Sequence, residues 1–130
     1  MMILMIVASL AGGLALAMGL KALVDPTWTM GLVRLVPDPE KVEGRSELRA
    51  IYGGVYSGGH VFALAALWLG GAGGSWAAAA IGAGWLTAGV VRAATMKMDG
   101  GASPYNQLGA GFEVVVGLAL MGPWMAVLLG

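Results

Sequence analysis

Two ionic side chains, Arg92 and Glu113, border or interrupt long apolar stretches of this chain. An arginine and a carboxylate can form a bidentate ion pair, and an arginine that is not fully neutralised binds carboxylates or phosphates. If these stretches cross a membrane, each charge costs about 2.5 to 3.5 kcal/mol on insertion scales and is expected to face other helices. Arg92 and Glu113 are therefore the first candidates for a functional site.

A second arginine, Arg49, is expected at a similar depth in the membrane. The depths of Arg92 and Glu113 below the membrane surface are expected to differ by only ~5 Å at 1.5 Å per residue, a distance that an arginine side chain can span. We therefore expect Arg49, Arg92 and Glu113 to converge. Two arginines against one carboxylate leave a net positive charge for a carboxylate or phosphate headgroup. In the alternative, Glu113 locks the helices through one arginine while the other reaches lipid phosphate.

Arg49 begins a polar stripe at helical spacing, which continues through Tyr52, Gly53, Tyr56 and His60. His60 is expected ~16 Å from Arg49 along the helix, too far for direct contact. Beside Tyr56 it could relay a proton. The alternative is a neutral histidine that hydrogen-bonds to a neighbouring helix.

Small residues flank both charges of the first pair. Gly109 and Gly117 lie four residues before and after Glu113, and the stripe at four-residue spacing before Arg92 consists of Ala88, Gly84 and Ala80. Small residues let helices approach closely in lipid, so we expect both stripes at helix contacts. Gly53 and Gly54 are further close-packing candidates. Glu47 is expected as an N-terminal helix acid at the interface.

The elements that position these residues follow from where the charges fall. All Lys and Arg residues lie in 21–49 and 92–97, and the stretches 1–20, 50–91 and 114–130 carry no charge. A membrane-spanning helix needs about 20 apolar residues, so the long middle stretch holds two helices. The pattern predicts an all-α integral membrane four-helix bundle. We expect one domain, 1–130, with spans of about 2–24, 47–69, 75–95 and 107–129.

The composition supports this class and excludes several others. Hydrophobic residues make up 58% of the chain and charged residues 11%, against about a quarter charged in soluble domains. The chain has no cysteine and one histidine, so disulfides, thiol nucleophiles and a bis-histidine haem within one chain are excluded. We expect no metal and no cofactor. Net charge is zero, with no basic tract for nucleic acid.

The positive charges also predict an orientation. By the positive-inside rule, loops 25–46 and 96–106 face the cytoplasm and both termini lie outside. Trp68 and Trp76 flank the uncharged turn, and Trp124 lies near the end of the last span. Tryptophans gather at membrane interfaces, which agrees with an outer position for these three residues.

Three segments together resemble a known family. They are the string 47–54 (Glu-Leu-Arg-Ala-Ile-Tyr-Gly-Gly), Arg92 followed by Asp99-Gly100, and the string 113–117 (Glu-Val-Val-Val-Gly). They are similar to the four-span bacterial membrane proteins called domain of unknown function 4345, over nearly the whole chain. The resemblance implies a compact four-helix fold in a bacterial inner membrane and supplies no reaction. Its matched positions are Glu47, Arg49, Tyr52, Gly53, Gly54, Arg92, Asp99, Gly100 and Glu113.

The layout is also loosely similar to that of DoxX-like four-span proteins, some of which are linked to redox systems. The absence of cysteine argues against a thiol-dependent role of that kind. Such a likeness at the level of the fold does not carry function.

The leading hypothesis is a non-catalytic binding or accessory protein. Its cytoplasmic-side Arg/Glu cluster would hold an amphipathic anion such as a lipid headgroup, or dock a membrane protein or a second copy of the chain.

One alternative is a membrane enzyme acting on an apolar substrate, with Glu113 as acid/base and Tyr52 or His60 assisting. It requires a Glu113 that is not tightly paired with arginine. The other alternative is a proton-coupled small-molecule transporter that acts as an oligomer.

Overall fold

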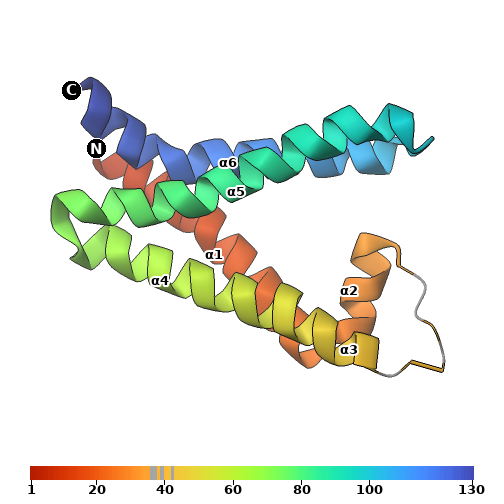
Figure 1. The fold of residues 1–130 in the computed structure, drawn as a ribbon. Coiled ribbons are helices and arrows are strands. Elements are labelled where there is room, and N and C mark those ends of the chain that lie inside the picture. The colour runs from red at the N-terminus through yellow and green to blue at the C-terminus, as the bar shows by residue number, and fades with distance from the viewer. Residues whose placement is uncertain (36–37, 39, 42) are drawn as a thin grey trace. The chain divides into compact units, whose positions relative to one another are not determined.

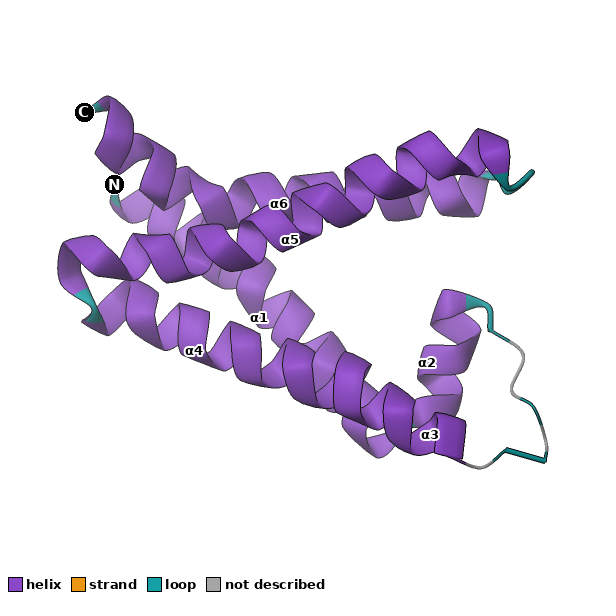
Figure 2. Cartoon of the chain, viewed as in Figure 1, coloured by secondary structure: helices purple, strands orange, loops and turns teal. Residues whose placement is uncertain are grey.

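The computed structural model describes residues 1–35, 38, 40–41 and 43–130, and these contain helices and no strand (Figure 2). The expected loop 25–46 includes positions 36, 37, 39 and 42, which lie outside the described residues. The elements, in chain order, are α1 (Met2–Val24), α2 (Pro26–Val33), α3 (Glu43–Leu48), the π-helix η1 (Arg49–Val55), α4 (Tyr56–Leu69), α5 (Gly71–Met98) and α6 (Pro104–Leu129) (Figure 1).

Four helices are long and apolar enough to cross a membrane: Met2–Val24, Glu43–Leu69, Gly73–Met96 and Pro104–Leu129. The second of these joins α3, η1 and α4 end to end. The predicted all-α membrane fold class is thereby confirmed. We conclude that the chain is a multi-pass membrane protein.

Three helices begin earlier than the sequence predicts, and each has a local cause. α5 starts at Gly71, which adopts φ +55°, and Gly70 and Gly74 lack the side chains that would collide in a tight turn; a Cβ on Gly74 would lie 1.8 Å from the Ala66 carbonyl oxygen. α6 starts at Pro104, since proline suits the first helical position and the Ser103 hydroxyl caps the helix end. The second spanning helix begins at Glu43, where α3 adds a turn.

The chain divides into two compact units. Unit 1 comprises Met1–Gly12 and Ala63–Gly130, and unit 2 comprises Gly13–Phe62. α1 and α4 therefore each contribute to both units. The expected single domain stays a prediction.

In unit 1, α5 and α6 form an antiparallel pair that is packed through glycines (Figure 1). A Cβ on Gly117 would lie 2.8 Å from the Gly82 carbonyl oxygen, and one on Gly89 would lie 2.9 Å from Val114. These positions bring the two backbones together, as small residues do in lipid. The stripe of Ala80, Gly84 and Ala88 is exposed. The expectation that this stripe makes the contact was wrong, because the face at three-residue spacing from Arg92, which contains Gly89, packs against α6.

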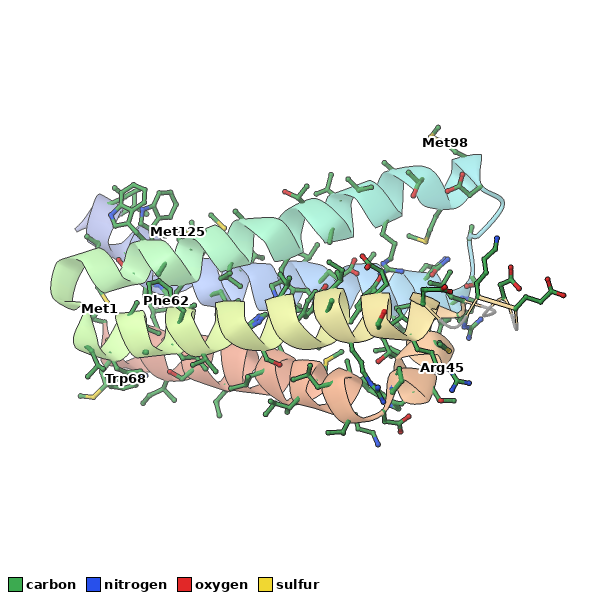
Figure 3. The ribbon with its side chains drawn as sticks, turned by 60° about the horizontal axis from the view of Figure 1, so that its bottom comes forward. Met1, Arg45, Phe62, Trp68, Met98 and Met125 are labelled. Carbon is green, nitrogen blue, oxygen red and sulfur yellow. The ribbon has the colours of Figure 1, made fainter. Side chains whose placement is uncertain are left out.

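Aromatic side chains gather at the end of unit 1 that holds both termini. Trp76 and Trp124 pack edge to face with ring centroids 5.2 Å apart, and Trp68 donates a 2.8 Å hydrogen bond to the Ser9 hydroxyl. Figure 3 shows Met1, Trp68 and Met125 near this end and Met98 at the far end of α5. The three tryptophans thus occupy the end away from Arg92.

In unit 2, the second half of α1 packs on η1 and the start of α4. A Cβ on Gly19 would lie 2.7 Å from the Ser57 hydroxyl, and a Cβ on Gly53 would lie 2.6 Å from the Leu23 side chain. Glycine at both positions is therefore what lets these helices touch. Asp25 then caps α2 by accepting a hydrogen bond from the Trp28 backbone N–H.

Candidate functional site

The turn between α5 and α6 sets the register that brings Arg92 opposite Glu113. α5 ends at Met98; Gly100 adopts φ +65°, and the Gly101 N–H donates to the Met96 carbonyl at 2.9 Å. A glycine in this left-handed conformation is the usual end of a helix. Asn106 then ties α6 to the turn, because its side-chain amide donates to the Gly101 carbonyl at 2.8 Å.

Arg92 and Glu113 form a bidentate ion pair between the two helices. Arg92 Nε donates to Glu113 Oε2 at 2.9 Å, and Nη2 donates to Oε1. Nη1 is 3.5 Å from the Asn106 side-chain oxygen, at the outer limit of a hydrogen bond. The pair is asymmetric in burial: 9% of the Glu113 side chain is exposed, against 41% of the Arg92 side chain. The carboxylate is inside the unit, and the guanidinium extends to its surface.

Gly109 makes room for this arrangement. A Cβ built on Gly109 would lie 3.5 Å from Arg92 Nε and 3.6 Å from its Cζ, so the guanidinium passes over the bare backbone of α6. Glu113 stands one turn further along the same face. Gly117, one more turn along, lies against α5, where a Cβ would be 2.8 Å from the Gly82 carbonyl oxygen. Gly109, Glu113 and Gly117 therefore form one continuous contact face toward α5.

The pair matters for stability because Glu113 is buried. Removing one partner of a buried ion pair leaves an uncompensated charge, which costs about 3 to 5 kcal/mol in fully buried cases. Water or headgroups screen the exposed part of Arg92, so we expect about 2 to 3 kcal/mol here. The pair therefore holds α5 and α6 together whatever else it does.

The geometry also limits the chemistry of Glu113. Both of its oxygens accept hydrogen bonds from the guanidinium. A carboxylate held in this way is poorly placed to take a proton from a substrate until Arg92 moves away. Arg92 keeps substantial exposed surface, and an arginine oriented by an acid is suited to hold a phosphate or carboxylate.

The other charged candidates, Arg49, Glu47 and Asp99, are exposed. Arg49 and Glu47 belong to unit 2 and are exposed. Their convergence with Arg92 and Glu113 stays a prediction. Asp99 is exposed and is the residue that ends α5, where its backbone N–H donates to the Thr95 carbonyl at 2.9 Å.

The aromatic stripe of unit 2 is a ladder of rings. The centroids of Tyr52 and Tyr56 are 5.9 Å apart, and those of Tyr56 and His60 are 6.0 Å apart. His60 is 3% exposed, and its Nδ1 lies 2.7 Å from the Tyr56 carbonyl oxygen. A carbonyl only accepts, so Nδ1 carries the proton in this contact. Gly53 is buried against Leu23, whereas Gly54 is exposed.

Two buried hydroxyls accompany this ladder in unit 2. Thr29 is 1% exposed and Ser57 is 8% exposed, and neither side-chain oxygen has a hydrogen-bond partner among the described residues. Ser57 shares the buried face of the helix with Gly53 and His60. A buried hydroxyl without a partner lowers stability, because its desolvation is not repaid.

Sequence reasoning missed two features. The first is Asn106, which lies beside the ion pair. Its helical spacing from Gly109 and Glu113 places it on the same face, and this spacing could have indicated its position. The π-helix η1 coincides with most of the string 47–54. The adjacent Gly53 and Gly54 were its only hint, since hydrophobic period does not distinguish a π turn.

A half-open cavity of about 220 Å³ lies at the other end of unit 1, lined by Met1, Met5, Leu67, Gly71, Ser75, Pro123 and Val127. Its lining is mostly apolar and does not include Glu113. Within the described part of the chain, no cluster of three His, Asp or Glu side chains could hold a metal ion.

A family model described as a domain of unknown function, DUF4345, matches residues 3–123 of the chain. No curated protein and no solved structure matches it.

Proposed function

The chain belongs to the DUF4345 family, a domain of unknown function, and we propose from its site that it is a small membrane binding or accessory protein. In this proposal the Arg92–Glu113 pair holds the anionic headgroup of a lipid. The membrane is the bacterial inner membrane, and loops 25–46 and 96–106 face the cytoplasm.

One observation supports the proposal above all: a half-exposed guanidinium is fixed by a buried carboxylate. The inner edge of Arg92 is occupied by Glu113, while 41% of the side chain is exposed. Arg92 lies about 9 Å from the end of α5 and Glu113 about 14 Å from the start of α6, at 1.5 Å per residue. An arginine at this depth extends toward the headgroups, and a planar donor held in place loses little entropy on binding phosphate.

The enzyme alternative requires a Glu113 that exchanges protons, and its two hydrogen bonds to Arg92 argue against that role. The transporter alternative requires a polar path across the membrane. His60 is a buried polar group for such a path, yet its Nδ1 is engaged by a carbonyl of its own helix. Headgroup binding requires neither a free carboxylate nor a path, and it is the function that we propose.

The decisive experiment separates binding from mere stability. In the double variant Arg92→Met/Glu113→Leu, apolar side chains of similar size replace both charges, a change that is often neutral for stability. We expect it to retain most of the thermal stability in detergent and to lose most of the copurified anionic lipid, measured by native mass spectrometry. Arg45→Gln removes an exposed arginine from unit 2 and is the matched control, with little expected change.

If the double variant keeps its full complement of anionic lipid, headgroup binding at this pair is wrong. If lipid is unchanged while a copurifying membrane protein or a second copy is lost, the pair docks a partner instead. Arg92→Lys sharpens the result. Lysine keeps the charge but loses the bidentate geometry, so we expect intermediate lipid retention.

The proposed orientation has its own test. The chain has no cysteine, so a single cysteine at Asp99 or at Gly73, where a Cβ meets nothing within 4 Å, reports on one side of the membrane. A membrane-impermeant thiol reagent added to intact cells should label Gly73→Cys and spare Asp99→Cys. The reverse pattern would overturn the cytoplasmic assignment of loop 96–106.

A further inference from the structure

We propose that η1 is a two-register segment. In this inference Arg49–Val55 changes between its π form and an α form, and the change turns Arg49 and α3 about the helix axis relative to α4. This is a conformational device that controls which side of the helix presents the Arg49 charge. It is independent of the headgroup site at Arg92, and either proposal can fail alone.

The backbone of η1 is the starting point. The Tyr56 N–H donates to the carbonyls of both Ile51 and Gly53, at the junction where the π-helix meets α4. A π turn holds one more residue than an α turn, is rare, and occurs mostly as a single turn at functional sites. η1 runs for seven residues and is flanked by α-helix on both sides. The competing α conformation therefore adjoins it at either end.

Packing anchors one end of η1 and not the other. Gly53 lies against Leu23, and Ser57 and Tyr56 lie against Gly19, so the α4 end is held by α1. α3 has no buried residue, and it contacts α2 at the surface. Rotation of the residues before Gly53 would therefore exchange surface contacts with α2 and would not break a buried core. In Figure 3, Arg45 of α3 points away from the helix.

Helix geometry gives the size of the proposed rotation. When η1 changes from the π form to the α form, the chain on the Glu43 side shifts by one residue along the helix. α3 then turns by about 100° and moves by about 1.5 Å along the axis relative to α4. The rotation accumulates along the segment, so it is small at Gly53 and nearly complete at Arg49. At the outer edge of a helix about 10 to 12 Å wide, it displaces a side chain by about 8 Å.

The two glycines of η1 differ in a way that an experiment can use. A Cβ on Gly53 would collide with Leu23 at 2.6 Å, whereas the nearest atom to a Cβ on Gly54 is the Arg49 carbonyl oxygen at 3.8 Å. Alanine at 54 is therefore accommodated and favours the α form through its high α-helix propensity. A Cβ on Gly58, in α4, meets nothing within 4 Å. Gly58→Ala is thus a matched control outside the segment.

Distances between spin labels in nanodiscs test the proposal, since the chain has no cysteine of its own. The reporter pair is Val24→Cys with Glu47→Cys, which joins the end of α1 to α3. The reference pair is Val24→Cys with Phe62→Cys, which joins it to α4. All three positions are exposed and lie in unit 2. We expect two distances for the reporter pair, differing by up to about 8 Å, and one for the reference pair.

Deletion of Ala50 removes the extra residue, so a continuous α-helix then holds α3 in the register that η1 gives it, and only the π-form distance should remain. Gly54→Ala should instead raise the population of the α-form distance severalfold, and Gly58→Ala should leave the populations unchanged. Gly54→Ala keeps the test valid if the deletion variant does not fold. A single reporter distance that Gly54→Ala does not alter would overturn the proposal. So would a reference pair that changes together with the reporter pair, because the motion would then lie outside η1.

Discussion

The two units satisfy their buried polar groups in different ways. In unit 1, Glu113 of α6 is paired with Arg92 of α5, so the polar contact itself joins two helices. In unit 2, the Nδ1 of His60 hydrogen-bonds to the Tyr56 carbonyl of its own helix, and Gly19 and Gly53 bring the helices into close contact. Polar substitutions should therefore disturb tertiary structure in unit 1, and mainly local structure in unit 2.

The largest expected effect is on the ion pair. Arg92→Ala leaves Glu113 buried without its partner, and we expect a loss of about 2 to 3 kcal/mol in the free energy of unfolding. Thermal unfolding in detergent measures it. The double variant Arg92→Met/Glu113→Leu should recover most of that loss. If the single and double variants are equally unstable, the defect is lost packing rather than an unpaired charge.

The next effect concerns the glycine contact of unit 1. A Cβ on Gly117 would lie 2.6 Å from Leu86 and 2.8 Å from the Gly82 carbonyl, so Gly117→Ala forces α5 and α6 apart. We expect a loss of about 1 to 3 kcal/mol, typical of overpacking. Gly84→Ala is the control on the exposed face of α5, where a Cβ meets nothing within 4 Å. It should be neutral or slightly stabilising, since alanine favours the helix. Equal losses in the two variants would contradict the assigned contact face.

A smaller effect of opposite sign is expected in unit 2. Ser57 is buried with an unpartnered hydroxyl, so Ser57→Ala removes an uncompensated polar group without removing a hydrogen bond. We expect a gain of about 1 kcal/mol in the free energy of unfolding. Differential scanning fluorimetry shows this as a higher Tm. A clear decrease in Tm would mean that the hydroxyl has a partner, such as a bound water, on which the helix contact depends.

Unit 1 was the more predictable of the two from sequence. Single charges in apolar stretches must find partners, which nominated Arg92 and Glu113 on physical grounds alone. The stripe facing α6 was misjudged, because Ala80, Gly84 and Ala88 are as small as the residues that do make contact. Small residues on a helix show that a face can pack closely, but they do not show which face meets the neighbouring helix.

In unit 2, the sequence predicted the shared face of the aromatic residues but neither the π-helix η1 nor α3. The spacing of Tyr52, Tyr56 and His60 predicted a shared face, and their rings do lie next to one another in a tilted arrangement. The π-helix was beyond that reasoning, since an α turn and a π turn are compatible with the same hydrophobic pattern over seven residues. The charged residues 38–49 carry no apolar period, so α3 had no hydrophobic pattern to reveal it.

The smallest effect is a local dependence on pH in unit 2. The Trp28 N–H hydrogen bond, followed by the hydrogen bond from Lys21, lowers the pKa of Asp25 below its ordinary value of 3.8. A lowered folded-state pKa means that the contribution of Asp25 is fully present above pH 3.8 and is lost as pH falls below it. Hydrogen exchange of α2 should therefore accelerate in that acid range. Asp25→Asn keeps a capping oxygen but loses the charge, so its α2 should exchange faster at neutral pH and respond little to acid. An unchanged acid response in that variant would assign the titration to another group.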